Sequence, residues 1–145
     1  MKVYLPEYFA LHELVPPEIY DKCGTRAWQL LDDRLLYTQD RLRNRFGKMK
    51  VNDYFWGGER EWSGLRTPDS PFYSRTSQHS FGRATDNLFS GIEAEEVRAI
   101  ILRERNNKDW RFISSIELGT DWLHYDVRNV KPILTFYPET YYGNS

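Results

Sequence analysis

The stretch from residue 77 to residue 86, SQHSFGRATD, carries the pattern on which the fold depends. His79 and Asp86 stand seven positions apart in it, with Gly82 between them. Glycine adopts backbone conformations with positive φ at little cost, so the chain can reverse at this position. The sequence therefore predicts a tight turn that brings an imidazole and a carboxylate together.

A second histidine lies in the segment 121–126, DWLHYD. If this segment is a strand, His124 and Asp126 share one face, because side chains alternate along a strand. Together with His79 and Asp86, the ring would complete a set of two imidazoles and one carboxylate. Such a set leaves one zinc coordination position open, as hydrolytic sites require. The spacing alone does not distinguish zinc from another divalent ion.

Hydrolysis also needs a base near the attacking water and a cation near the carbonyl oxygen. Asp121 and Asp126 flank His124 and are the two candidates for the base. Arg66, in the turn-rich segment WSGLRTP, is the candidate for the cation. By spacing alone, these residues can equally be ordinary turn-forming and packing residues, so a metal site is one of two interpretations.

The composition fits one soluble globular domain that spans residues 1–145, with 40% hydrophobic and 28% charged residues. A formal net charge of −1 argues against nucleic-acid binding through a basic face. The single cysteine, Cys23, allows neither an internal disulfide nor a multi-cysteine zinc site. The first 15 residues are too polar for a signal-peptide core and too few to span a membrane. We therefore expect no membrane insertion, and a location in the cytoplasm of the producing cell until release.

Apolar residues at helical spacing predict one helix from Thr25, as N-cap, to a terminating Gly47, and another over residues 92–105. Short strands are expected near residues 48–54, 110–114, 122–127 and 133–137. Helices come first, followed by strands with one helix inserted among them. This order favours an α+β domain with a mainly antiparallel sheet and flanking helices.

The segment 77–86 resembles the serine-x-histidine-x-x-glycine-x-alanine-x-aspartate signature of the M15 peptidases. These are the D-alanyl-D-alanine carboxypeptidases and L-alanyl-D-glutamate endopeptidases that share a fold with the Hedgehog signalling domain. All fixed positions are present: Ser77, His79, Gly82, Ala84 and Asp86. DWLHYD resembles the second family signature, an acidic residue three positions before a histidine, and WSGLRTP resembles the arginine-bearing segment upstream. The motifs follow the family's order between Trp62 and Asp126, a little under half of the chain.

The resemblance implies a Hedgehog/DD-peptidase-like fold and a zinc ion with three ligands: His79, Asp86 and His124. It implies that Asp121 is the catalytic base and that Arg66 holds the substrate or the developing oxyanion. Ser77 is expected to support the loop of the first histidine. Asp126 shares the strand face of His124 and is therefore expected to hydrogen-bond that ring rather than to act as the base.

Regular strand geometry would place Asp121 and His124 on opposite faces, because three positions separate them. Gly119 and Thr120 come directly before this segment. We expect a bend there that allows both side chains to face the same ion.

The resemblance implies a zinc-dependent peptidase that hydrolyses stem peptides of bacterial peptidoglycan by direct attack of water. The missing signal peptide and wall-binding module are typical of a phage lysis enzyme. The first expectation is therefore a monomeric endolysin of the L-alanyl-D-glutamate endopeptidase type. D,D-carboxypeptidase or dipeptidase action is the second. Two other classes stay open: a virion-associated structural protein that retains the peptidase fold, and a binding module that has lost turnover. An intact base and arginine favour an enzyme over the last class.

Overall fold

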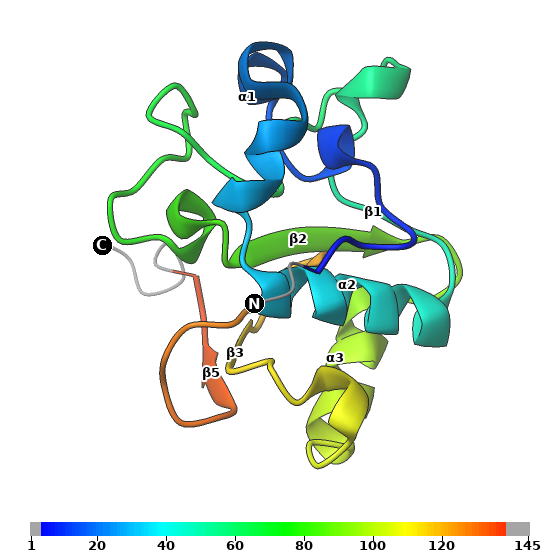
Figure 1. Ribbon diagram of the computed structural model, residues 1–145. Coiled ribbons are helices and arrows are strands. Elements are labelled where there is room, and N and C mark those ends of the chain that lie inside the picture. Colours follow the sequence, from blue (N-terminus) through cyan, green and yellow to red (C-terminus); the bar gives the residue numbers. More distant parts are fainter. Residues whose placement is uncertain (1–3, 139–145) are drawn as a thin grey trace.

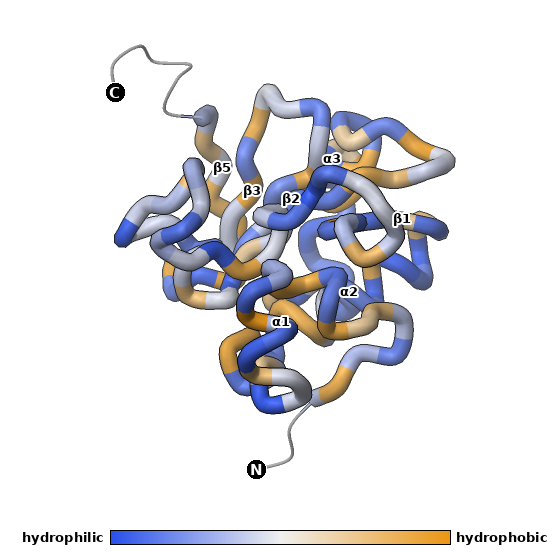
Figure 2. The backbone as a smooth tube through the Cα atoms, turned by 90° about the horizontal axis from the view of Figure 1, so that it is seen from above, coloured by the Kyte–Doolittle hydropathy of each residue, from blue (hydrophilic) through white to orange (hydrophobic). Residues whose placement is uncertain are grey.

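A five-stranded sheet forms the centre of the computed structural model, which describes residues 4–138 (Figure 1). Its strands in chain order are β1 (Met49–Lys50), β2 (Ala84–Phe89), β3 (Ser115–Glu117), β4 (Leu123–Asp126) and β5 (Leu134–Phe136). They lie in the spatial order β1-β2-β4-β3-β5, with β1 and β5 at opposite sides (Figure 2). The pairs β1–β2, β2–β4 and β3–β4 are antiparallel, and β5 adds parallel to β3. The sheet is therefore mixed, with the antiparallel pairs in the majority.

Three α-helices accompany the sheet in the described residues: α1 (Pro17–Cys23), α2 (Asp33–Phe46) and α3 (Ala94–Arg103). Short 3₁₀ helices fill the connections: η1 (Leu11–Glu13), η2 (Gly24–Leu30), η3 (Tyr54–Trp56), η4 (Gln78–Phe81) and η5 (Lys108–Trp110). The described residues thus form one α+β domain, which is the predicted class. The ends of the expected domain, residues 1–3 and 139–145, lie outside the described residues. None of the helices in residues 4–138 has the length and apolar character needed to cross a bilayer.

Helix α2 packs across one face of the sheet and fixes which strand residues are buried beneath it. The hydroxyl groups of Tyr125 and Thr85 donate to Oε1 of Gln39 on α2, at 2.7 and 2.8 Å. Arg45 near the end of α2 forms an ion pair with Glu104, the residue that follows α3, at 2.8 Å. Burying each large aliphatic side chain here contributes roughly 1.5–3 kcal/mol. Helix α2 therefore covers the face that carries Thr85 and Tyr125, and the alternate residues of each strand lie on the other face.

The helix expected from Thr25 onward begins later than predicted. Residues 24–30 form η2 instead, and Leu31 is extended. Asp32 then caps α2, because its carboxylate accepts a hydrogen bond from the Arg34 amide at 2.9 Å. The end of this helix was predicted correctly, since Gly47 follows its last residue with φ +84°.

The prediction of a strand over residues 110–114 is also wrong. Trp110 closes the 3₁₀ helix η5, where its buried indole N–H donates to the carbonyl oxygen of Glu104 at 2.9 Å. Its ring stacks on Phe46 at the end of α2, with centroids 6.1 Å apart. Packing around the helix end thus produces the apolar pattern, and β3 begins only at Ser115. The strand expected over 48–54 is reduced to β1, whereas β4, β5 and α3 fall inside their predicted ranges.

Candidate metal centre

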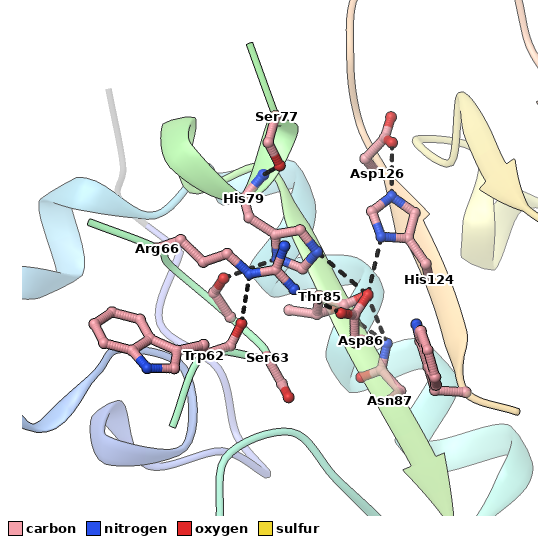
Figure 3. Close-up of polar contacts among 12 residues, drawn as sticks. Trp62, Ser63, Arg66, Ser77, His79, Thr85, Asp86, Asn87, His124 and Asp126 are labelled. Carbon is pink, nitrogen blue, oxygen red and sulfur yellow. Dashed lines mark hydrogen bonds and ion pairs between the residues drawn. The ribbon is translucent and has the colours of Figure 1, made fainter. Parts of the chain in front are cut away.

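The side chains of the three predicted ligands point toward one another beside β2 and β4 (Figure 3). Oδ1 of Asp86 lies 2.9 Å from Nδ1 of His124 and 3.2 Å from Nε2 of His79. One ligand atom from each residue falls within 4.8 Å of the other two. All three residues are buried, with residue exposures of 2 to 8%. Two imidazoles and a carboxylate at this separation can hold a divalent metal ion.

The predicted turn at Gly82 delivers His79 to this cluster. Ser77 caps η4, since its hydroxyl accepts a hydrogen bond from the backbone amide of His79 at 3.3 Å. Gly82 ends the helix with φ +67°, and a Cβ there would overlap the carbonyl oxygen of Leu30. Both the turn and the close approach require glycine. The turn and the supporting role of Ser77 are therefore confirmed.

Strand pairing delivers the other two ligands. Asp86 on β2 and His124 on β4 are direct partners in the antiparallel register. Directly opposed residues project to the same face, with Cβ atoms about 4.5–5.5 Å apart. The sheet itself therefore holds the carboxylate beside the second ring.

The hydrogen bonds around His79 define the tautomer of its ring. Nδ1 lies 2.9 Å from the carbonyl oxygen of Gly64, which can only accept, so Nδ1 carries the hydrogen. Burial lowers the pKa of His79, which favours the neutral ring. Its Nε2 lone pair then faces Oδ1 of Asp86, and two acceptors confront each other at 3.2 Å. A cation between them removes this repulsion, and the donor set thus fits a metal ion.

Both ring nitrogens of His124 lie within hydrogen-bond distance of a carboxylate. Nε2 lies 3.1 Å from Oδ2 of Asp126, while Nδ1 faces Asp86. Burial favours the neutral ring, but the hydrogen bonds to Asp126 and Asp86 outweigh it and raise the pKa of His124 to about 9. Asp126 is fully buried and receives Nε and Nη2 of Arg128, at 2.7 and 2.6 Å. The expected hydrogen bond between Asp126 and His124 is therefore confirmed.

Burial opposes ionisation of Asp86, but the two histidines and their hydrogen bonds hold its pKa well below the usual range. Its second oxygen, Oδ2, receives Nη2 of Arg66 at 3.0 Å. Asp86 therefore stays a carboxylate, with one oxygen directed at the histidines and the other at the guanidinium.

Arg66 thus lies at the site, as predicted. Its Nε donates to the carbonyl oxygen of Trp62 at 2.7 Å, and its backbone amide donates to the carbonyl oxygen of His79 at 3.1 Å. Nη1 makes no hydrogen bond to the described part of the chain. The guanidinium is thereby fixed in position, with one N–H pair available to another group.

Asp121 is not brought together with the ligands. It is exposed in the turn before β4 and lines a pocket against α3, together with Glu95 and Arg98. The bend expected at Gly119 exists, with φ +82°. The side chain that it redirects lies beside the helix, so the bend does not bring Asp121 to the histidines.

Sequence reasoning overlooked one carboxylate, Glu117 on β3. Its pKa is raised, mainly by burial, and the charges of His124, Asp86 and Arg66 all act on it. The alternation of side chains along a strand could have identified it. In Ser115–Glu117 the central isoleucine is fully buried, so Glu117 faces the side of the sheet opposite to Ile116.

Neither family models, curated proteins nor solved structures gave a match to this chain. Its function is therefore inferred from the motifs and from the geometry of the centre.

Proposed function

We propose that the protein is a zinc-dependent peptidase that hydrolyses stem peptides of bacterial peptidoglycan. The observation that supports this most is the buried cluster of His79, Asp86 and His124, in which every ligand has a partner that orients it. When bound, zinc would supply Lewis-acid polarisation of a carbonyl and water acidified to near-neutral pKa. The resemblance of the same residues to the M15 signatures adds the substrate class and a Hedgehog/DD-peptidase-like fold to the proposal.

Arg66 would act on the substrate carbonyl in this reaction. Its guanidinium is largely enclosed, and two acceptors already fix its direction, Asp86 and the Trp62 carbonyl. A preorganised cation next to an oxygen that gains negative charge lowers the barrier of peptide hydrolysis. The unengaged Nη1 gives Arg66 a donor for that oxygen while it continues to hold Asp86.

Hydrolysis also requires a proton acceptor close to the attacked carbonyl. The resemblance implies that Asp121 has this role, and the charges of His124, Asp86 and Arg66 act on a second carboxyl group, that of Glu117. Both oxygens of Asp126 already accept hydrogen bonds from Arg128 and His124. Asp126 therefore orients the ring of His124 and does not accept the proton of the attacking water.

The biological setting that we propose is phage lysis, with the protein acting as a monomeric endolysin of the L-alanyl-D-glutamate endopeptidase type. It would remain in the cytoplasm of the producing cell until release to the wall. This part of the proposal rests on the resemblance. The fragments released from peptidoglycan distinguish it from D,D-carboxypeptidase or dipeptidase action.

The decisive experiment combines metal analysis with digestion of purified peptidoglycan and mass determination of the fragments. We expect one zinc per chain and fragments cut within the stem peptide, both lost in His124→Ala. His12→Gln is the matched control, because His12 is the histidine outside the site and stacks on Phe55 with ring centroids 3.9 Å apart. A chain without stoichiometric zinc, combined with unchanged wall degradation by His124→Ala, would contradict the proposal.

A further inference from the structure

Gln39 is a polar residue of α2 that is fully buried against the sheet. Its Oε1 accepts hydrogen bonds from the hydroxyl groups of Tyr125 and Thr85, at 2.7 and 2.8 Å. Its Nε2 donates to Oδ1 of Asn87 at 3.1 Å. The amide of this one glutamine is therefore bonded to three side chains on two strands, β2 and β4.

The partners of Gln39 are the chain neighbours of two metal ligands. Thr85 and Asn87 stand on either side of Asp86 along β2 (Figure 3). Tyr125 directly follows His124 along β4. Because side chains alternate along a strand, the ligands project to the opposite face from these partners. Gln39 thus binds both strands from behind, at the level where they present Asp86 and His124.

Asn87 extends this network to the residue before His124. Its Nδ2 donates to the carbonyl oxygen of Leu123 and to Oγ1 of Thr85, both at 3.0 Å. The β2 and β4 neighbours of both ligands are therefore joined by hydrogen bonds. The four side chains of the network, those of Gln39, Thr85, Asn87 and Tyr125, are all fully buried.

Every side-chain nitrogen and oxygen of these four residues has a partner within the described part of the chain. A buried polar network that is fully satisfied rigidifies the structure around it and specifies one arrangement. Apolar side chains of similar volume could fill the same space, but hydrogen bonds also have preferred distances and angles. The network therefore restricts how β2 and β4 lie relative to each other, in addition to filling the core.

We infer that Gln39 is a positioning residue of the metal centre. It touches none of the three ligands, and it acts through the backbone of β2 and β4, which carry Asp86 and His124. A metal site binds its ion best when the ligands are already held close to the required geometry. The inference rests on the metal ion of the proposed function, and it does not depend on the substrate.

Gln39→Met tests this role, because methionine has a similar length and lacks the amide. Calorimetric titration should show zinc affinity reduced about tenfold, the lower end of the effect of removing an outer partner of a metal site. The visible absorption bands of the cobalt(II)-loaded variant should also shift, because they depend on coordination geometry. Thr85→Val and Tyr125→Phe each remove one hydroxyl group at nearly constant shape. They should cause smaller losses in the same direction, and they keep the test decisive if Gln39→Met does not fold.

Thr38→Val is the matched control on the same helix. Thr38 is also fully buried, but its hydroxyl donates to the carbonyl oxygen of Arg34 at 2.7 Å, within α2 itself. This variant should lower Tm and leave zinc affinity and the cobalt spectrum unchanged. The comparison separates the placement of the ligands from a general loss of stability.

The outcomes separate this inference from the proposed function. If the wild type and Gln39→Met bind zinc equally well and give the same cobalt spectrum, Gln39 has no positioning role and the peptidase stands. An equal loss of affinity in Thr38→Val would also overturn the inference, because destabilisation alone would then explain it. A zinc-loaded wild type that cleaves no stem peptide overturns the peptidase, whereas the expected loss of affinity in Gln39→Met still supports the inference. A wild type that binds no zinc overturns both.

Discussion

Nε2 of His124 lies 3.1 Å from Oδ2 of Asp126, a carboxylate that is fully buried beside the metal centre. Two hydrogen bonds from Arg128 keep this carboxylate in place. A ring nitrogen that donates to a carboxylate leaves the other nitrogen directed at the ion and more basic. Asp126 would therefore act on a bound metal ion through His124, without touching the ion.

Asp126→Asn should weaken zinc binding about 10- to 100-fold, the usual effect of removing a partner that orients a ligand. Titration calorimetry with zinc measures this directly, and circular dichroism verifies that the fold is retained. Asp21→Asn, at an exposed position of α1, is the matched control. Equal affinities in the two variants would show that Asp126 has only a structural role.

Asp86→Ala should abolish zinc binding, because it removes the carboxylate that both histidines face. A ligand that binds only the folded state stabilises it by about 2.7 kcal/mol at 100 times its Kd. The wild type should therefore show a zinc-dependent rise in Tm that Asp86→Ala lacks. A rise of the same size in the variant would mean that zinc binds elsewhere.

The zinc-induced rise in Tm should grow between pH 6.5 and 9. The folded pKa of His124 is raised to about 9 from an ordinary 6.5. The bonds of the protonated ring to Asp86 and Asp126 therefore stabilise the metal-free protein fully below pH 6.5, and this stabilisation is lost as the pH rises through 9. Zinc needs the neutral ring, so its affinity should increase about tenfold per pH unit while one proton is displaced. Melting curves with zinc and with a chelator across this range test the direction of this pH dependence. A zinc-induced rise in Tm that stays constant with pH would refute the prediction.

Gly82→Ala should lower the free energy of unfolding by about 2 kcal/mol or more. The left-handed conformation alone costs a non-glycine residue roughly 1–2 kcal/mol, and the added methyl group also meets the Leu30 carbonyl. Gly91→Ala is the control, because its Cβ would meet open space. Urea unfolding should show a change within about 0.5 kcal/mol for the control. Equal losses in both variants would remove the special role of Gly82.

The local part of the metal centre could be predicted from the sequence. The turn at Gly82 and the shared face of His124 and Asp126 depend only on backbone preferences within a few residues. Both are present in the structure. The start of α2 could not be predicted in this way. The amide of Asp32 donates to the carbonyl oxygen of Gly82 at 2.9 Å, a contact between residues far apart in the chain.

The sheet face on which Glu117 lies could not be predicted from the sequence for the same reason. Its face depends on the register of β3 against β4, and that register depends on where β3 begins. The buried ring of Trp110 takes the residues before β3 into a 3₁₀ helix, a tertiary effect that the alternation of residues 110–114 concealed. The direction of the Asp121 side chain could not be predicted either, because sequence spacing carries no information on which way the turn before β4 directs it.

The register of β3 against β4 has a consequence for insertions and deletions. A slip of β3 by one residue would turn Glu117 toward the helices and bring Ile116 to the metal face. Ile116 is fully buried, and exposing it would cost about 1.5–3 kcal/mol. The apolar packing beneath the sheet therefore selects the observed register of β3 against β4. Length changes within β3 should be tolerated far less in evolution or engineering than changes in the exposed turn at residues 129–131.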